Sequence, residues 1–301
     1  TELYIFSDGN NDKNISNSVV KVREYCKKID GFKSVTIKNR IVNFGLANSI
    51  IEGVSSILKK HERIIVLEDD IITSKYFLKY MNDALEYYEL EQKVISVHGY
   101  LPSVNLELKS DTFFLKGADC WGWGTWRRGW ELFNPNGKAL LEKLSNGQLS
   151  RFNFNNSYDF YGMLKDQISG KNDSWAIRWN ASAFIKNKLT LHPSKSLVMN
   201  IGNDNSGTHS KSSSEMDTKI SDSEISICKI PLEDSKEAVK AFELFYKSNQ
   251  RRSIKLKVKK KLGKYIKLNF TNIKENLSKV IPPYLIFVLK KSFFLKKYTI
   301  H

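Results

Sequence analysis

The feature that most constrains the fold is a short apolar run that ends in three consecutive acids. Residues 64–67 read Ile-Ile-Val-Leu, and Glu68, Asp69 and Asp70 follow directly. A fully apolar run of this length is typical of a strand that is buried on both faces of a sheet. Three adjacent carboxylates repel one another unless a cation or solvent compensates their charge. This stretch therefore predicts a buried strand that delivers an acidic cluster to one edge of a sheet.

Strand-like and helix-like patterns alternate through the first 100 residues. The expected strands cover residues 3–6, 32–37, 64–67 and 94–97, and the expected helices cover residues 19–29, 46–58 and 74–88. This alternation predicts an α/β fold with a Rossmann-like, mostly parallel sheet flanked by helices. Ligands of such sheets bind beyond the carboxyl ends of the strands, so we expect Asp8 and the acidic triplet at the same edge.

The rest of the chain is less regular. Trp and Gly are concentrated in residues 111–136, two helical pieces are expected in 138–170, and a helix in 175–185 precedes a strand-like stretch in 189–199. Residues 200–224 have the polar composition of a long loop. We expect a catalytic domain over residues 1–230 and a basic amphipathic helical extension over residues 231–301.

Charge and cysteine content limit the compartment and the partners. The chain carries a formal charge of +16, and residues 251–301 hold 15 Lys and Arg with one acid, so the body is nearly neutral. Cys26, Cys120 and Cys228 are far apart and lack metal-ligand spacing, which fits a reducing compartment. No apolar run approaches the ~20 residues that a membrane-spanning helix needs. These features predict a cytoplasmic protein that lies peripherally on the inner face of the cell membrane.

The acidic triplet suits a hard divalent cation. Carboxylate oxygens are the ligands that Mg²⁺ and Mn²⁺ prefer, and a metal there can bridge the diphosphate of a sugar nucleotide. The alternative is a solvated acidic turn that begins the next helix, since helix N-termini favour acids.

Residues 117–126 interleave glycines with Trp121, Trp123 and Trp126. Indole faces suit the C–H surfaces of sugars, and glycines allow a close approach of the backbone. We expect a sugar or acceptor pocket here, built from Asp119, Trp121, Trp123 and the later Trp175. The alternative is that these indoles fill the core, and we expect at least one of those in residues 117–126 to do so.

Several motifs together resemble glycosyltransferases of the A fold. They are Ile5-Phe6-Ser7-Asp8-Gly9, Asn43-Phe44-Gly45-Leu46-Ala47-Asn48-Ser49, Val66-Leu67-Glu68-Asp69-Asp70, Asp173-Ser174-Trp175-Ala176-Ile177-Arg178-Trp179, Asn200-Ile201-Gly202 and Gly207-Thr208-His209. The order and spacing over residues 1–210 are similar to bacterial family-two-like sugar transferases and to the N-acetylglucosaminyltransferase I group.

The resemblance implies a role for each motif. Asp70 would bind the metal, Glu68 and Asp69 would lie near the ribose and diphosphate, and Asp8 would lie by the nucleotide base. Asn43, Gly45 and Asn48 would line the nucleotide pocket, and His209 would be a further metal or diphosphate ligand, with a surface-loop histidine as the alternative. The family also has an earlier strand that contacts the nucleotide, so we expect a missing segment upstream.

Asp173 is the expected general base. An inverting transferase needs a carboxylate on the acceptor side to take the hydroxyl proton. The resemblance points to Asp173, whereas the alternative is that Asp173 or Ser174 only caps the following helix. Asp119, Asp159 and Asp166 are the rival bases.

The tail interleaves seven lysines between residues 255 and 267 with apolar residues. A basic amphipathic segment of this kind predicts an anionic membrane surface as partner. Nucleic acid is the less favoured partner because no recognition motif accompanies the charge. A solvated helical face without a partner is the third interpretation.

These features predict a metal-dependent, inverting glycosyltransferase in surface polysaccharide biosynthesis. It would move a sugar from a nucleotide-sugar donor to a glycan or lipid-linked acceptor, with Mn²⁺ or Mg²⁺ as cofactor. The rival is a non-catalytic, membrane-associated module of degenerate transferase fold that binds a glycan or a partner. A hydrolase that uses the same acidic site is a more distant third.

Overall fold

The computed structural model describes residues 1–10, 17–202 and 216–252. Two compact units are distinguished, Thr1–Tyr246 and Lys247–His301, and the account below concerns the first. This unit continues past residue 230, where we had placed the domain boundary. The reason is that a helix beginning at residue 236 buries Ala238 and Phe242 against Phe113 and Leu115.

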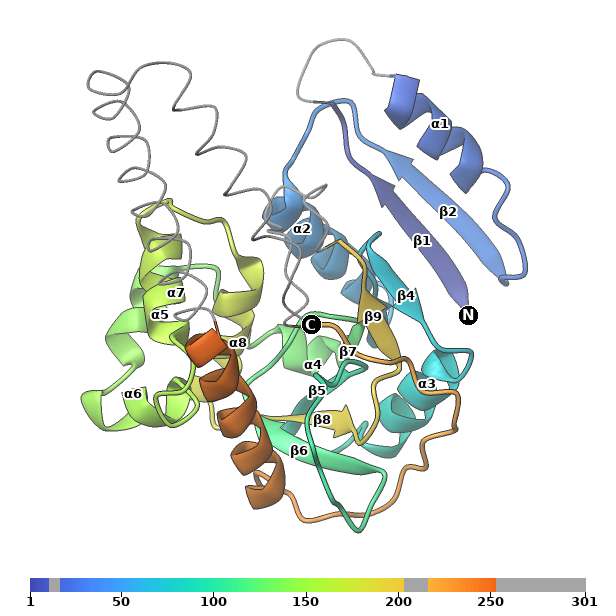
Figure 1. The fold of residues 1–301 in the computed structure, drawn as a ribbon. Helices are drawn as coiled ribbons and strands as arrows, with labels where there is room; N and C mark the ends of the chain where they lie inside the picture. Colours follow the sequence, from blue (N-terminus) through green and yellow to red (C-terminus); the bar gives the residue numbers. More distant parts are fainter. Residues whose placement is uncertain (11–16, 203–215, 253–301) are drawn as a thin grey trace, which may run out of the picture. The chain divides into compact units, whose positions relative to one another are not determined.

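Three sheets form the framework of this unit (Figure 1). In the first, β1 (Glu2–Ser7) pairs in parallel with β2 (Ser34–Asn39). In the second, the strand order is β3-β7-β5-β8-β6, and the strands are β3 (Arg63–Val66), β7 (Trp123–Trp126), β5 (Val94–His98), β8 (Leu189–Pro193) and β6 (Thr112–Lys116). In the third, β4 (Ile71–Thr73) pairs antiparallel with β9 (Val198–Asn200).

The five-stranded sheet is mixed. Only β5 and β8 run parallel, whereas β3–β7, β7–β5 and β8–β6 are antiparallel pairs. The α/β class is confirmed, and the sheet is mixed where we expected it to be mostly parallel. The antiparallel strands β6 and β7 come from the Trp- and Gly-rich region, where the sequence pattern predicted no strand.

Eight helices are assigned before residue 202. They are α1 (Asn17–Cys26), α2 (Leu46–Leu58), α3 (Phe77–Tyr87), α4 (Arg127–Trp130), α5 (Gly137–Lys143), α6 (Asn146–Phe152), α7 (Phe160–Ile168) and α8 (Trp175–Ile185). The predicted bounds of α2 and α8 are confirmed. The stretch 138–170 contains three helices where two pieces were expected, because Ser145 begins α6 with a capping box and Asp159 caps α7.

Successive residues of β3 serve two different cores, as the alternation of side chains along a strand requires. Ile65 packs against the cluster that contains the apolar face of α3, including Phe77 and Met81. Ile64 and Val66 pack instead against the cluster formed by α2 and α8. The sheet is therefore covered on both faces, which leaves the strand ends as the place for a site.

Strands β1 and β3 are among the edge strands, and each pairs on one side only within the described residues. Strand β1 pairs only with β2, and β3 pairs only with β7. The Tyr4 hydroxyl of β1 lies 3.1 Å from His61 Nε2, just before β3. The Leu-Tyr-Ile-Phe run of β1 is half-buried along its whole length, whereas β5 and β8 are fully buried. The expected upstream strand stays a prediction.

Candidate functional site

The acidic triplet lies in a turn between β3 and β4. Strand β3 ends at Val66, and the amide of Ile71 donates to the carbonyl of Glu68 at 3.2 Å, which closes the turn. Asp69 is exposed, whereas Glu68 and Asp70 are half-buried. The three carboxylates are therefore delivered to one edge of the five-stranded sheet, as the sequence predicted.

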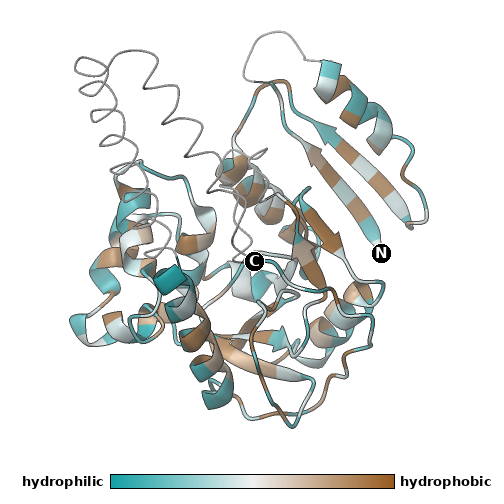
Figure 2. Ribbon diagram, in the orientation of Figure 1, coloured by the Kyte–Doolittle hydropathy of each residue, from teal (hydrophilic) through white to brown (hydrophobic). Residues whose placement is uncertain are grey.

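Strand β9 fixes Asp70 from across the short sheet. Strands β4 and β9 are largely apolar (Figure 2). They pair in a register that puts Ile71 opposite Asn200. The side-chain amide of Asn200 donates to Asp70 Oδ2 at 3.0 Å, and the amide of Ile201 donates to the Asp70 carbonyl at 2.8 Å. A Cβ at Gly202 would clash with the Asp70 carboxylate, so only glycine allows this approach. The Asn-Ile-Gly motif thus supports the acidic cluster directly.

The cluster has unbalanced negative charge. Burial raises the pKa of Glu68 to about 7, and the neighbouring carboxylates of Asp70 and Asp69 add to the effect. Asp70 Oδ1 is buried, and no hydrogen-bond partner for it lies among the described residues. A buried carboxylate oxygen without a donor is costly unless a cation approaches it. These two observations fit a divalent metal next to Asp70 and Glu68.

The protein supplies only part of a metal shell in the described portion of the chain. No group of three His, Cys, Asp or Glu side chains there is close enough together to hold an ion. Mg²⁺ is usually held by one or two carboxylates together with substrate phosphates and water, so Asp70 with Glu68 suffices for that kind of site. His209, the further ligand expected from the sequence, lies outside the described residues.

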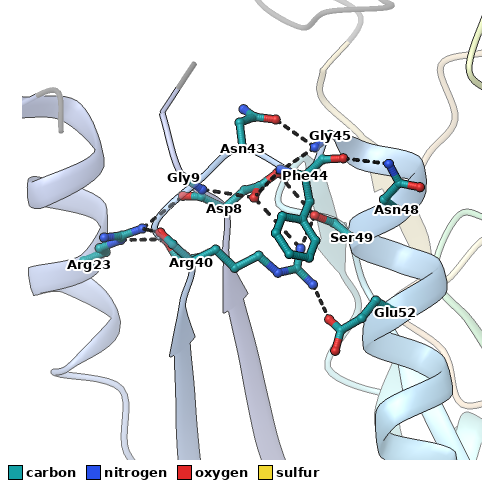
Figure 3. Close-up of polar contacts among 11 residues, drawn as sticks. Asp8, Gly9, Arg23, Arg40, Asn43, Phe44, Gly45, Asn48, Ser49 and Glu52 are labelled. Atoms are coloured by element: carbon teal, nitrogen blue, oxygen red, sulfur yellow. Dashed lines mark hydrogen bonds and ion pairs between the residues drawn. The ribbon is translucent and has the colours of Figure 1, made fainter. Parts of the chain in front are cut away.

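Asp8 organises the loop that precedes α2 (Figure 3). Its carboxylate accepts hydrogen bonds from the amides of Gly9, Phe44 and Gly45 at 2.9–3.1 Å and from the Ser49 hydroxyl at 3.2 Å. A carboxylate offers about four acceptor positions, so these four donors occupy its capacity. Asp8 therefore holds the loop in place, whereas the resemblance had implied a contact with the nucleotide base.

Two arginines complete this network. Arg23 donates to the Asp8 carbonyl at 3.1 Å and to the Arg40 carbonyl at 2.7 Å. Arg40 pairs with Glu52 and lies over the Phe44 ring, 4.3 Å from its centroid. These partners could not be predicted from the sequence, because they lie in α1, just after β2 and in α2, and they meet only in the fold.

The residues expected to line a nucleotide pocket do lie together. Asn43, Phe44, Asn48, Ile51, Glu52 and Ser55 surround a depression of roughly 500 Å³. Asn43 Oδ1 accepts from the Gly45 amide at 2.7 Å, and Asn48 donates to the Phe44 carbonyl at 3.0 Å. Gly45 has a φ of 73°, a conformation that suits glycine and lets the loop enter α2. The depression has the size of a small-ligand site.

Most of the expected indole platform is core. Trp123 is completely buried and Trp175 is 3% exposed, with their ring centroids 5.4 Å apart. Protein covers both indoles, so neither presents a face to a sugar, because α2 and α8 close over them. Trp126 is also buried, where its Nε1 donates to the Leu85 carbonyl at 2.9 Å. Trp121 differs from these three indoles, because it is half-buried and packs edge-on against the Tyr100 ring.

Cys120 feels the charge of Asp119 and of the acidic cluster. Burial and the neighbouring Asp119 carboxylate raise the pKa of the Cys120 thiol. The charges of Glu68 and Asp70 raise the pKa of this thiol further. The Asp119 side chain is 46% exposed, and one of its oxygens accepts from the Cys120 amide at 2.8 Å.

The candidate bases differ in how their carboxylates are occupied. Ser174 caps α8, which leaves Asp173 free of capping, 62% exposed and 3.7 Å from Arg178. Asp159 caps α7 through the Gly162 amide, and Asp166 pairs with Lys171 at 3.0 Å. Of these four carboxylates, Asp173 and Asp119 are therefore the two that neither cap a helix nor pair with a lysine among the described residues.

The basic tail predicted to bind membranes lies outside the described residues, which end at 252. Within the described part of the chain, every helix is too short or too polar to cross a membrane. Comparison with models of protein families and with curated proteins gave no match for this chain.

Proposed function

We propose that the chain transfers a sugar from a nucleotide-sugar donor to a hydroxyl of a glycan or lipid-linked acceptor, assisted by a divalent metal. The observation that carries the proposal is the buried Asp70 Oδ1, which has no donor in the described structure and lies beside the proton-retaining Glu68. The acidic cluster follows the end of β3, and the Asn43–Asn48 loop helps to line a separate depression of roughly 500 Å³, a size that suits a small ligand.

Asp70 and Glu68 would hold Mn²⁺ or Mg²⁺. When bound, such an ion supplies positive charge against the departing diphosphate. Glu68 would release its proton on binding, because a cation stabilises the ionised carboxylate. The Asn200 and Gly202 contacts keep the Asp70 carboxylate in one orientation, so little reorganisation is needed when the ligand arrives.

Asp173 is the proposed base on the acceptor side. Its carboxylate takes the proton of the acceptor hydroxyl while the hydroxyl oxygen attacks the anomeric carbon. The bond between that carbon and the diphosphate oxygen breaks, and its electron pair leaves with the nucleoside diphosphate. This single displacement inverts the anomeric configuration. Arg178 Nη2 lies 3.7 Å from Asp173 Oδ1, so this arginine is the cation that faces the proposed base.

Turnover of a donor panel tests the proposal. UDP-, GDP-, dTDP- and CMP-sugars are offered with Mn²⁺ or with EDTA, and nucleotide release is followed with glycan or lipid-linked acceptors. We expect release from one donor class only, loss of release with EDTA or Asp70→Ala, and binding without turnover for Asp173→Asn. Asp166→Asn is the matched control, because it neutralises a nearby carboxylate that pairs with Lys171.

The outcomes separate the alternatives. A product of retained anomeric configuration would remove Asp173 from the role of base. Nucleotide release that does not depend on acceptor would favour a hydrolase. Failure of every donor to bind would favour the non-catalytic binding module.

A further inference from the structure

Two histidines face each other inside the sheet, next to the candidate site. His98 ends β5 and His192 lies in the parallel neighbour β8, where the pairs Ser96–Thr190 and Val97–Leu191 put the two histidines opposite. Their Nδ1 atoms are 3.3 Å apart, and both residues are buried. The Phe113 ring stacks on the His192 ring with a centroid distance of 5.4 Å, so Phe113 covers one face of His192.

One backbone hydrogen bond fixes the tautomer of the neutral His98 ring. The amide of Trp121 donates to His98 Nε2 at 3.2 Å. A backbone N–H is always the donor, so His98 Nε2 carries no proton and the neutral ring is protonated at Nδ1. That Nδ1–H faces His192 Nδ1 at 3.3 Å, and His192 accepts the proton's hydrogen bond in the tautomer that carries its own proton on Nε2.

Burial disfavours the charged form of both rings. Burial lowers the pKa of His98, although the Asp119 carboxylate, whose Oδ2 lies 3.8 Å from Nδ1, opposes the effect. Burial lowers the pKa of His192 well below its usual value, and His98 lowers it further. The Tyr100 carbonyl opposes both shifts, and the Tyr100 hydroxyl stays protonated because burial raises its pKa.

Both ring nitrogens of His98 face the short segment of residues 119–122. Asp119 lies on the Nδ1 side of His98, and the Trp121 amide lies on the Nε2 side. The Gly99 amide, next along the chain, donates to the Gly122 carbonyl at 2.7 Å. Segment 119–122 is thus fastened to the end of β5, with the Trp121 ring against Tyr100.

Burying two imidazole rings costs desolvation free energy. An apolar pair would avoid the desolvation of four ring nitrogens, and only an arrangement in which the donors and acceptors are paired offsets that cost. The Nε2 acceptor faces the site segment, and the His192 acceptor keeps the proton of His98 on Nδ1. The polar pair therefore gives the segment a defined orientation that an apolar pair would not.

We infer that His98, with His192 behind it, is a positioning residue that holds Asp119 and Trp121 at the sugar side of the site. The inference rests on the proposed sugar transfer for its functional consequence, whereas the tautomers stand on geometry alone. His98 touches no substrate in this account. It acts through the segment 119–122.

A first experiment reads the tautomers without any substrate. Long-range ¹H–¹⁵N NMR of the ¹⁵N-histidine-labelled full chain reports which ring nitrogen carries the proton. We expect His98 protonated at Nδ1, His192 protonated at Nε2, and both rings neutral at pH 6.5. A His98 ring protonated at Nε2, or a pair that titrates like exposed histidine near pH 6.5, would overturn the inference.

A second experiment measures transfer with matched variants. His98→Gln keeps an acceptor near the position of Nε2, whereas His98→Phe removes it. We expect kcat to fall about 10- to 100-fold in His98→Phe, as expected for a small misplacement of site groups, and to recover in large part in His98→Gln. Ser96→Ala, which removes one buried hydrogen bond to Gly124 from the same strand, is the control and should keep kcat.

Binding of the nucleoside diphosphate separates positioning from unfolding. Calorimetry with the diphosphate of the active donor and Mn²⁺ should give the same affinity in His98→Phe as in the parent. An unchanged kcat in a folded His98→Phe variant would overturn the positioning role and leave the proposed transfer intact. If the parent protein transfers no sugar at all, the proposed function and the positioning role are both wrong. The NMR experiment would still report which nitrogens of His98 and His192 carry protons.

Discussion

Asp8→Ala should lower the free energy of unfolding by about 3 kcal/mol. Hydrogen bonds to a charged group each contribute about 1.5–3 kcal/mol, and four donors meet this carboxylate. The contributions do not add, because the donors share one acceptor group. The Asp8 side chain is also 28% exposed, so water replaces some of the lost bonds. About 3 kcal/mol is therefore expected, well below the sum of the four.

Urea unfolding followed by circular dichroism measures this loss. The m-value should stay constant while the midpoint falls, because the surface exposed on unfolding is the same. Asp8→Asn should lose less, about 2 kcal/mol, since one acceptor oxygen remains. Asp30→Ala removes an exposed carboxylate from the same region and should change stability by less than about 0.5 kcal/mol.

Amide hydrogen exchange locates the effect. Protection of the Phe44 and Gly45 amides should fall in Asp8→Ala, because these amides donate to the carboxylate. A loss under about 1 kcal/mol with protection unchanged would refute the reasoning, since it would mean that the loop does not depend on Asp8. That result would return Asp8 to the nucleotide-binding role implied by the resemblance.

Further predictions concern charge and packing. Glu68 keeps its proton up to a pKa of about 7 in the folded state, so its contribution to stability is full below 4.5 and is lost as pH rises through 7. Glu68→Gln should therefore stabilise the protein at pH 8 and have little effect at pH 4, as thermal melts across pH would show. Gly202→Ala should weaken Mn²⁺ binding in a calorimetric titration by displacing the Asp70 carboxylate. Trp123→Ala should cost about 3–5 kcal/mol in urea unfolding, whereas Trp121→Ala should spare stability and lower the transfer rate.

The local elements were largely predictable because their signals are local. The apolar spacing of α2 and α8 gave their bounds, and the apolar run at 64–67 gave β3 to within one residue. Strand direction was not predictable, because a buried apolar run looks the same in parallel and antiparallel sheets. Strands β6 and β7 were missed for a related reason, since Trp and Gly gave residues 111–136 the look of a loop.

The candidate site, like the fold, was only partly predictable from the sequence. Acids at a strand end could be predicted from the chain, and Asp70 and Glu68 do lie together there. The four hydrogen bonds to the Asp8 carboxylate could not be predicted, because three of the donors belong to Phe44, Gly45 and Ser49, at least 36 residues along the chain. The same holds for His98 and His192, because the contact between their rings depends on the parallel register of β5 and β8.

Calorimetric titration of Mn²⁺ in the presence of UDP, GDP or dTDP tests the central claim most directly. The account predicts that one nucleoside diphosphate binds together with Mn²⁺, that EDTA abolishes its binding, and that Asp70→Ala loses it while remaining folded. Binding that is indifferent to Asp70→Ala, or the absence of any binding of metal and nucleotide, would contradict a metal-dependent sugar transferase built on this acidic cluster.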